Sequence, residues 1–438
     1  MNEVRTERNE VRTGPPTVLL VGGIDTHLDR VKAQGARVVL LQHPDKLTPY
    51  QTSNADVLLV VDYTDWDTVR PFAEAARAVY GVDVVFSLTE GGLNPAARLS
   101  DLFGLGDGQR YEVSRRLRDK WLMRRHLAVH GLPTPDAAPV TDRESLSTFG
   151  AVAGYPFIVK PTSTTAGFGL LRADSPADLD RVWQRVTELL GGRTDRGSTL
   201  FTVDGFLMEG HVDGPEFSVE AFSFAGRHVV VAVTEKLVDD AHFAELGHAL
   251  PARLSPADRS ELVAAVERFL TVMGVSDGPS HTEIRLSSQG PVVIESHNRV
   301  GGGHLAELVR HAYGIDLNTY AAAWALGRAE ELPGEPVASA AACNRYVVRE
   351  PGTVTAVEGL DEVAAADDVL IAQVSVRPGD TVRPLRDNWD RIGCVVVRAA
   401  DTDEAVRRCE ELTRHTLRIE TAADPEQAVL VGELDTAA

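Results

Sequence analysis

The stretch His281-Thr-Glu-Ile-Arg-Leu-Ser-Ser-Gln-Gly-Pro-Val-Val-Ile-Glu-Ser-His297 decides how the middle of this chain folds. The turn residues Ser287-Ser-Gln-Gly290 at its centre predict an antiparallel hairpin. If the turn centres on Gln289, Glu283 faces Glu295 on one side of the sheet. The two histidines that end the stretch then face each other on the same side.

This pairing brings two carboxylates together and predicts a cation between them. Directly opposed side chains have Cβ atoms about 5 Å apart, and like charges at that distance destabilise a sheet. Carboxylate oxygens that leave several coordination positions open are typical of Mg²⁺ bound together with substrate phosphates. The alternative is a solvated edge hairpin whose register is shifted by one residue. Spacing alone leaves this alternative open.

Upstream of the hairpin, three features are suited to binding a nucleotide. A strand that ends at Lys160 is followed by the loop Pro161-Thr-Ser-Thr-Thr-Ala-Gly-Phe-Gly169. Such a loop can direct backbone N–H groups and hydroxyls at phosphate oxygens, and the lysine adds a point charge. Glu209 ends the next strand, and Glu216 follows where a carboxylate can accept both hydroxyls of a ribose. Taken alone, the loop is equally typical of a turn, and each acid of a solvated strand end.

Downstream of the hairpin, Glu295-Ser-His-Asn-Arg299 leads into Gly301-Gly-Gly303. We expect this sequence to place a guanidinium beside the metal, in a segment where the glycines leave room.

Lysine usage gives an independent signal. Only five of the 44 basic residues are lysines, namely Lys32, Lys46, Lys120, Lys160 and Lys236. Such usage is typical of a GC-rich genome that replaces Lys by Arg wherever either serves, so a surviving Lys indicates a need for a compact ammonium. Chance explains Lys32 and Lys46.

The two ends of the chain have different patterns. Four buried strands alternate with helical segments in the first hundred residues and predict an open parallel α/β layer; the strands are Thr17–Gly22, Arg37–Leu41, Asp56–Val61 and Val82–Phe86. The last hundred residues predict an α+β domain. We expect a disordered leader at 1–14, an α/β domain at 15–112, a central domain at 113–331 with a subdomain at about 151–203, and the C-terminal domain at 332–438.

Composition excludes several classes of function. The net charge of −20 opposes binding to nucleic acid. No apolar run approaches the ~20 residues of a membrane helix. The three cysteines, Cys343, Cys394 and Cys409, lack metal-ligand spacing, which fits a reducing cytoplasm.

The order of these motifs resembles the ATP-grasp superfamily over about residues 15 to 420. The resemblance rests on Asp119-Lys120, Gly131–Pro135, Val159-Lys160-Pro161, Met208-Glu209 with Gly214-Pro-Glu216, Glu283, and Glu295-x-x-x-Arg299. The first domain is similar to a pre-ATP-grasp domain, and the segment from Arg391 is similar to the C-terminal domain of biotin-carboxylase-like members. Thr234-Glu-Lys236 and Phe243–Pro251 most resemble the L-amino acid ligases, which make dipeptides.

The resemblance implies a role for each matching residue, with ATP and two Mg²⁺ ions as cofactors and Mn²⁺ as a substitute. It implies nucleotide binding by Lys120, Lys160, Thr162, Ser163, Thr164, Thr165, Gly167, Glu209, Val212 and Glu216. It implies catalytic roles for Lys236, Arg299, Glu245 and His248, metal binding by Glu283, Glu295 and His297, and an acid pocket at Gly302, Gly303 and His304. From sequence, Glu245 and His248 are equally explained as a surface pair. His297 stands where the family commonly has Asn; imidazole is a softer ligand for Mg²⁺, so His297 can instead contact phosphate or substrate.

The function implied is a cytoplasmic, ADP-forming carboxylate–amine ligase that acts through an acyl-phosphate. Its partners are a small-molecule acid and amine, with no nucleic acid or membrane, and a homodimer is left open. A role in natural-product biosynthesis fits a GC-rich origin. One alternative is a carboxylase-like enzyme, although a Met-Lys-Met biotin carrier motif is absent. The other is a catalytically silent nucleotide-binding regulatory protein.

Overall fold

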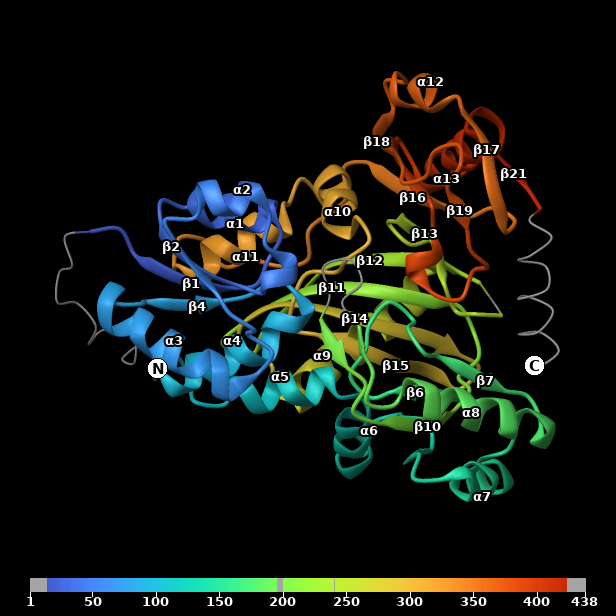
Figure 1. The fold of residues 1–438 in the computed structure, drawn as a ribbon, viewed down its shortest axis with the longest axis horizontal. Helices are drawn as coiled ribbons and strands as arrows, with labels where there is room; N and C mark the ends of the chain where they lie inside the picture. Colours follow the sequence, from blue (N-terminus) through green and yellow to red (C-terminus); the bar gives the residue numbers. More distant parts are fainter. Residues whose placement is uncertain (1–13, 195–199, 240, 424–438) are drawn as a thin grey trace. The chain divides into compact units, whose positions relative to one another are not determined.

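A computed structural model describes residues 14–194, 200–239 and 241–423 (Figure 1). The chain forms two compact units. The first contains residues 14–111 and Asn318–Glu330, and the second contains Glu112–Leu317 and the described residues from Glu331 onward. The four-part division expected from the sequence stays a prediction, and the grouping of Asn318–Glu330 with the first unit is a feature that it did not include.

The first unit is an open parallel α/β layer, as the sequence predicts. Its sheet has the order β3-β2-β1-β4, built from β1 (Thr17–Val21), β2 (Arg37–Gln42), β3 (Val57–Val60) and β4 (Val84–Phe86). The helices are α1 (Asp25–Lys32), α2 (Pro49–Asn54), α3 (Trp66–Tyr80), α4 (Glu90–Leu102) and most of α11 (Leu317–Ala325). Ala322 of α11 lies in the same buried cluster as Val18 and Leu20 of β1.

The second unit contains a four-stranded antiparallel sheet that carries the loop after Lys160. Its order is β5-β10-β6-β7, from β5 (Ala137–Pro139), β10 (Phe206–Gly210), β6 (Phe157–Pro161) and β7 (Leu171–Ala173). Helices α7 (Arg143–Ala153) and α8 (Leu179–Leu189) lie beside it (Figure 1), and Leu146, Val182 and Phe206 share its core. Helices α5 (Arg110–Arg118) and α6 (Lys120–Val129) precede it, and Asp119 caps α6 by accepting from the Leu122 N–H.

The main element of the second unit is an eight-stranded antiparallel sheet. Its order is β15 (Gly290–His297), β14 (Gly278–Ser287), β11 (Glu216–Phe224), β12 (Arg227–Val238), β13 (Glu245–Leu250), β16 (Ala341–Val347), β20 (Gly393–Ala399) and β18 (Val369–Val374). Helix α9 (Pro256–Met273) contributes Leu262, Val266 and Phe269 to the core beneath it. Because β13 pairs with β16, the sheet runs without a break across the boundary expected at residue 331.

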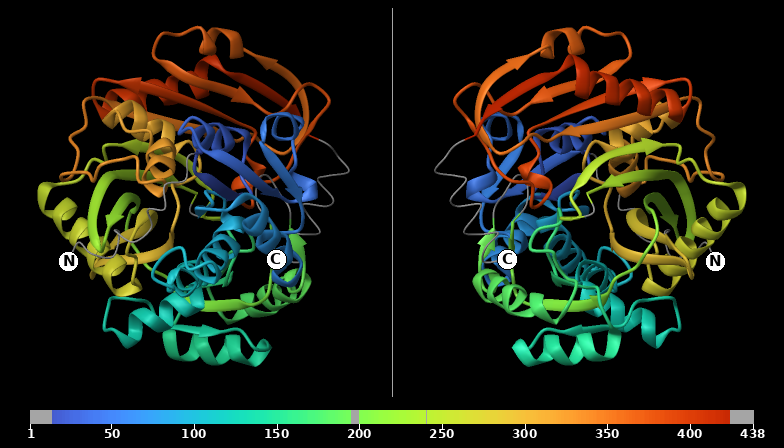
Figure 2. Two further views of the ribbon diagram at one scale, coloured as in Figure 1. Left: turned by 90° about the vertical axis from the view of Figure 1, so that its left-hand side faces the viewer. Right: turned by 90° about the vertical axis from the view of Figure 1, so that its right-hand side faces the viewer.

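The C-terminal part, residues 332–423, adds a second layer to this sheet (Figure 2). A three-stranded sheet has the order β19 (Thr381–Val382), β17 (Gly352–Glu358) and β21 (Arg418–Ala422), with helices α12 (Leu360–Ala364) and α13 (Thr402–Glu411). Cys343 and Cys409 lie in the core between these elements. Helix α10 (Leu305–Tyr313) follows the glycine segment. Among the described residues, no helix is long and apolar enough to cross a membrane.

The predicted residue pairs of the hairpin β14–β15 are confirmed, but the turn lies elsewhere than assumed and a bulge compensates for the difference. Glu283 faces Glu295 and the terminal histidines face each other. The assumed turn centre at Gln289 is wrong, because Ser287 pairs with Gly290 and the turn therefore has two residues. A β-bulge at Ile294 restores the register between Ile284 and Glu283. Without that extra residue, the two carboxylates would point to opposite faces.

Candidate active site

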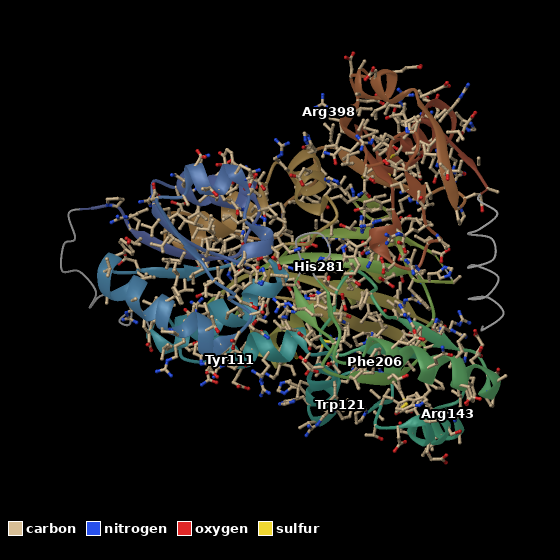
Figure 3. The ribbon with its side chains drawn as sticks, viewed as in Figure 1. Tyr111, Trp121, Arg143, Phe206, His281 and Arg398 are labelled. Atoms are coloured by element: carbon tan, nitrogen blue, oxygen red, sulfur yellow. The ribbon has the colours of Figure 1, made fainter. Side chains whose placement is uncertain are left out.

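The polar residues of the site share one face of the eight-stranded sheet. Paired residues of an antiparallel sheet point to the same side, so the register fixes which side chains meet. Lys236 on β12 pairs with His248 on β13, which pairs with Asn344 on β16. His281, labelled in Figure 3, lies on β14, the second strand from one edge of this sheet.

Lys236 and His281 from this face line a pocket of about 220 Å³ in the second unit. The sequence-predicted residues that line it are Lys120, Lys160, Thr164, Thr165, Gly167, Glu209, Val212, Glu216, Lys236, Glu245, Glu283, Glu295, His297, Arg299, Gly302 and Gly303. Thr162, Ser163, His248 and His304 are not among its lining residues. Their roles, like those of the lining residues, stay predictions.

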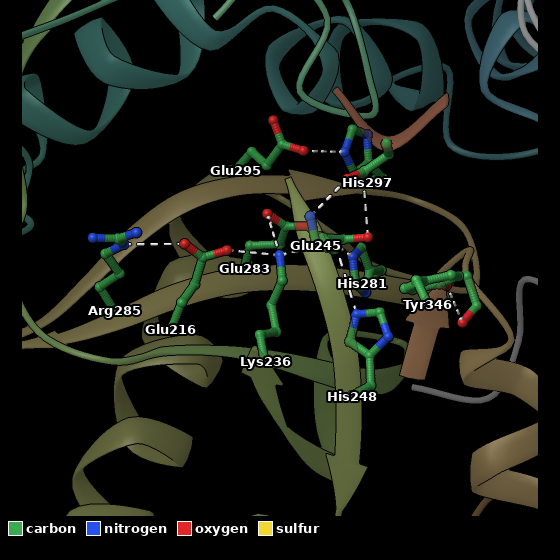
Figure 4. Close-up of polar contacts among 12 residues, drawn as sticks. Glu216, Lys236, Glu245, His248, His281, Glu283, Arg285, Glu295, His297 and Tyr346 are labelled. Carbon is green, nitrogen blue, oxygen red and sulfur yellow. Dashed lines mark hydrogen bonds and ion pairs between the residues drawn. The ribbon is translucent and has the colours of Figure 1, made fainter. Parts of the chain in front are cut away.

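Lys236 is the electrostatic centre of the pocket (Figure 4). Its Nζ lies 2.6 Å from Glu216 Oε1, 3.0 Å from Glu245 Oε1 and 3.0 Å from Glu283 Oε2. Burial acts against the charge, but the three carboxylates raise the pKa of Lys236 well above its ordinary value. Lys236 is therefore a fixed positive charge at the floor of the pocket.

The second carboxylate of the hairpin is held by a different lysine. Glu295 Oε2 lies 2.7 Å from Lys120 Nζ, and Glu295 Oε1 lies 3.2 Å from His297 Nε2. Burial opposes ionisation, but Lys120 and His297 hold the pKa of Glu295 well below its ordinary value. Each carboxylate of the opposed pair thus has an ammonium neighbour in this structure.

The two opposed carboxylates fit a magnesium ion whose other coordination positions are taken by phosphate oxygens. Glu283 and Glu295 face each other and both line the pocket. Among the described residues, no three His, Cys, Asp or Glu side chains form a cluster able to hold a metal alone. Mg²⁺ commonly binds one or two carboxylates together with substrate phosphates, and this pair can supply that share. His297 contacts Glu295, and its role as a ligand stays a prediction.

Glu209 joins two cations at the nucleotide end of the pocket. Its Oε1 lies 2.5 Å from Lys160 Nζ, and its Oε2 accepts from Arg124 Nε at 2.9 Å. Burial alone would raise the pKa of Glu209, but Arg124 and Lys160 outweigh this effect and lower the pKa to about 2. Arg124 was given no role from the sequence. Its remaining nitrogens donate to the carbonyls of Val293 and Ile294, at the bulge of β15.

The loop after Lys160 is fastened by Lys120. The Lys120 Nζ donates to the Thr164 carbonyl at 2.9 Å, and the Lys120 backbone N–H donates to the Thr162 carbonyl at 2.8 Å. Ala166 and Gly167 have φ of +62° and +73°, the left-handed backbone of a tight turn. Thr164, Thr165 and Gly167 of this loop line the pocket, whereas Thr162 does not.

Glu216 is held in position by Arg285, which the sequence analysis missed. Arg285 Nε donates to Glu216 Oε2 at 3.0 Å, and Arg285 Nη1 donates to the Val212 carbonyl at 2.9 Å. Glu216 on β11 pairs directly with Arg285 on β14, so the alternation of polar residues on these two strands is the signal that could have indicated the contact.

Glu245 and His248 are neighbours on β13 and do not form a surface pair. His248 is 1% exposed, and its Nε2 lies 3.8 Å from Glu245 Oε1. Its Nδ1 lies 3.2 Å from Asn344 Oδ1. His304 precedes α10 with φ of +69° and is about half-buried.

The C-terminal part supplies further residues that the sequence analysis missed. Asn388 and Arg391 line the pocket, and the Arg391 guanidinium lies 3.5 Å from the centre of the Tyr346 ring. The Tyr346 hydroxyl and the Asn344 Nδ2 both donate to the Gly303 carbonyl, at 2.8 and 2.9 Å. Nothing local in the sequence signals these contacts.

The expected room at Gly301–Gly303 exists only at Gly302. A Cβ on Gly301 would lie 2.6 Å from Leu305 and 2.7 Å from His281, and a Cβ on Gly303 would lie 2.5 Å from the Tyr346 hydroxyl. Gly302 has open space, with no atom within 4 Å of a Cβ. Gly303 also has φ of +62°. The glycines at 301 and 303 therefore permit close packing, which corrects the expectation of general space.

Residues 153–307 match the family model of the ATP-grasp domain. This chain contains an ATP-grasp domain. The domain is followed by a match to the L-amino acid ligase C-terminal domain 2 at residues 345–422.

The chain is also similar to individual proteins. The chain is 30% identical over 299 residues to the uncharacterized protein y4rH of Sinorhizobium fredii, a match that covers 67% of this chain and 60% of that protein's length. It is 22% identical over 329 residues to an L-arginine-specific L-amino acid ligase of Bacillus subtilis, covering 74% of this chain and 77% of that one.

A solved structure shows the same fold. The L-amino acid ligase from Bacillus licheniformis superposes with a TM-score of 0.79 at 22% identity, over 94% of this chain and 100% of the other. The α/β architecture with an ATP-grasp domain, expected from the sequence, is confirmed.

Proposed function

We propose that this protein is an ATP-dependent ligase that joins the carboxylate of an amino acid to an amine and releases ADP and phosphate. The observation that carries the proposal is the single sheet face on which Lys236 and the opposed Glu283 and Glu295 lie, in one pocket with Arg299. The similarity to an L-arginine-specific L-amino acid ligase supports the substrate class.

The first step needs positive charge where a phosphoryl group moves. A carboxylate is a poor electrophile because oxide is a poor leaving group, so a carboxylate oxygen attacks the γ-phosphorus of ATP and ADP leaves. Lys236 and Arg299 offset the charge of the transferred group, and Lys120 and Lys160 hold the other phosphates. Glu283 and Glu295 would hold Mg²⁺, which when bound neutralises phosphate oxygens.

The second step needs a neutral amine and the exclusion of water. The neutral amine nitrogen attacks the acyl carbon and becomes positively charged, its extra proton passes to Glu245 or His248, and phosphate leaves as the carbon–oxygen bond breaks. Water would compete for the same carbon, so the loop Thr162–Gly169 has to cover the acyl-phosphate until the amine is bound. Gly302, with its open space, is the position at which the acid side chain fits.

Other features belong to the same proposal. They are a two-ion site in which Mn²⁺ substitutes, a ribose contact at Glu216, a cytoplasmic location, a homodimer and a place in natural-product biosynthesis.

The test is nucleotide analysis with a panel of amino-acid pairs. We expect ADP, phosphate and an amide in equal amounts, and we expect hydroxylamine to trap the activated acid as a hydroxamate. Stoichiometric AMP would overturn the proposal, and bicarbonate-dependent ADP release would favour a carboxylase. Lys236→Met should abolish hydroxamate formation, whereas Lys46→Met, outside the pocket, serves as the matched lysine control.

A further inference from the structure

A short turn of the C-terminal part reaches into the active site. This C-terminal turn comprises residues 386–391 and contains the single helical turn Asn388–Asp390. Asn388 and Arg391 from it line the pocket. The turn contacts both the loop after Lys160 and the strand that carries Glu245.

Asn388 makes three hydrogen bonds that join these two regions. Its backbone N–H donates to the Ala166 carbonyl at 3.1 Å. Its Oδ1 accepts from the Glu245 backbone N–H at 2.7 Å, and its Nδ2 donates to Glu245 Oε2 at 3.0 Å. Asn388 therefore contacts both the backbone and the carboxylate of Glu245 while its own backbone N–H holds the loop. Arg391 of the same turn also donates to the Glu245 carbonyl, at 3.1 Å.

Trp389 strengthens the contact with the loop. Its ring lies 5.7 Å from the ring of Phe168 and is stacked 6.1 Å from the ring of Phe201. Phe168 and Phe201 belong to the core of the four-stranded sheet that carries the loop. Aromatic contacts of this kind favour one fixed position of the loop against the turn.

Ala166 is an unusual place for such an anchor. It is a non-glycine residue with φ of +62°, next to Thr165 and Gly167 at the pocket wall. Left-handed backbone is costly for alanine and persists where the surroundings enforce it. The hydrogen bond from Asn388 to its carbonyl is one such constraint.

We propose that Asn388 is a positioning residue that couples the phosphate loop to Glu245, the group that receives the amine. The inference rests on the proposed function, because it assigns the loop to ATP and Glu245 to the amine. When Glu245 is in place, Asn388 holds the loop closed over the acyl-phosphate. When the side-chain bonds between Asn388 and Glu245 are removed, the position of the loop no longer depends on the position of Glu245.

Uncoupling has a defined chemical result. Water attacks the acyl carbon, the phosphate leaves, and the free acid is regenerated while ADP has already been released. ATP is then consumed without amide. The ratio of ADP to amide therefore measures the coupling and is not changed by a general loss of folded protein.

The experiment compares variants within the C-terminal turn. Asn388→Ala removes both side-chain bonds to Glu245 and leaves the backbone bond to Ala166. Asn388→Asp keeps the size and the Oδ1 acceptor but loses the Nδ2 donor, so it tests the same link if the alanine variant is poorly folded. Arg386→Ala is the matched control, because its side chain contacts Asp390 in the same turn and does not line the pocket.

We expect Asn388→Ala and Asn388→Asp to raise the ratio of ADP to amide by about tenfold or more, the scale of one hydrogen bond to a charged group. We expect the KM for the amine to rise more than the KM for ATP, and Arg386→Ala to keep the wild-type ratio. If both Asn388 variants make ADP and amide in equal amounts, the coupling is overturned. If wild-type protein forms neither hydroxamate nor amide, the proposed function fails instead.

Discussion

Glu209 shows how a single buried side chain can hold the nucleotide end of the pocket together. It is 3% exposed and pairs with Lys160 and Arg124. Removing one partner of a buried ion pair leaves charge without compensation, which costs more than the pair itself contributes. The resemblance implied that Glu209 binds the nucleotide; the structure adds the ion pairs of its side chain.

We predict that Glu209→Gln destabilises the protein by about 3–5 kcal/mol near neutral pH. The folded pKa of Glu209, about 2, lies below its ordinary value of 4.5, so its contribution is present above about pH 4.5 and is lost as pH falls toward 2. Urea unfolding should show the difference from wild type shrinking as pH falls from 5 toward 3. Glu188→Gln, which affects a surface pair with Arg185, should change stability by less than about 1 kcal/mol. A difference independent of pH would argue against this role of the carboxylate.

Two structural features destabilise any larger residue at position 303, the left-handed backbone and the nearby Tyr346 hydroxyl. Its φ of +62° is left-handed, and a Cβ would lie 2.5 Å from the Tyr346 hydroxyl. We predict that Gly303→Ala costs about 1–2 kcal/mol through the backbone alone and more through the clash. Tyr346→Phe removes the clashing oxygen, so Gly303→Ala should be less costly in that background. Thermal unfolding of the four proteins gives the coupling, and an equal cost in both backgrounds would contradict it.

At the scale of elements, the bulge in β15 decides whether the two carboxylates meet. Bulges expose backbone groups that need partners, and Arg124 donates to the Val293 and Ile294 carbonyls at 2.6 and 2.9 Å. Helix α6, through one buried arginine, thus supports the geometry of the hairpin.

We predict that Arg124→Met weakens the response to Mg²⁺ as well as stability. Without its donors, the bulged carbonyls are unsatisfied and Glu295 loses its fixed position. The Mg²⁺ concentration for half-maximal ADP formation should rise about tenfold or more, as for other residues that orient metal ligands. Arg125→Met on the same helix is exposed and should leave this value unchanged. An unchanged value in Arg124→Met would separate the bulge from the metal site.

The same hairpin shows how far sequence reasoning reached. The predicted pairing of Glu283 with Glu295 is right because two deviations from the assumed register cancel, the position of the turn and the bulge at Ile294. The two-residue turn and the bulge are offsets in opposite directions, and sequence spacing detects neither. Asn388 and Asn344 could not be predicted at all, because they lie 143 and 96 residues along the chain from the residues that they contact.

At the scale of the whole chain, the C-terminal part is a structural continuation of the main sheet. Its three cysteines are buried, at 0% exposure for Cys343 and Cys409 and 4% for Cys394. Burial raises the pKa of Cys394 to about 12 and the pKa of Cys409 well above its ordinary value. Thiols react as thiolates, so Cys394 and Cys409 are protected both by burial and by a raised pKa. The hydrogen bond with Cys409 lowers the pKa of Cys343, which is protected by burial alone.

We predict that native protein does not react with a thiol reagent at about pH 8, and that all three cysteines react together once the C-terminal part opens. Absorbance during reaction with a disulfide reagent, with and without urea, is the measurement. Fast reaction of one thiol in native protein would mean that this core opens without the rest of the sheet.

The pairing of β13 with β16 also limits how chimeras of this protein and its relatives can be built. A recombinant that joined residues up to 331 of this chain to the tail of a relative would preserve the backbone pairing, because sheet hydrogen bonds do not depend on side chains. It would still replace Asn344, Tyr346 and Asn388, which touch His248, Gly303 and Glu245. The substrate selectivity of such a chimera would therefore depend on both parent proteins. A chimera that keeps the selectivity of one parent would have to take Asn344, Tyr346 and Asn388 together with the residues that they contact.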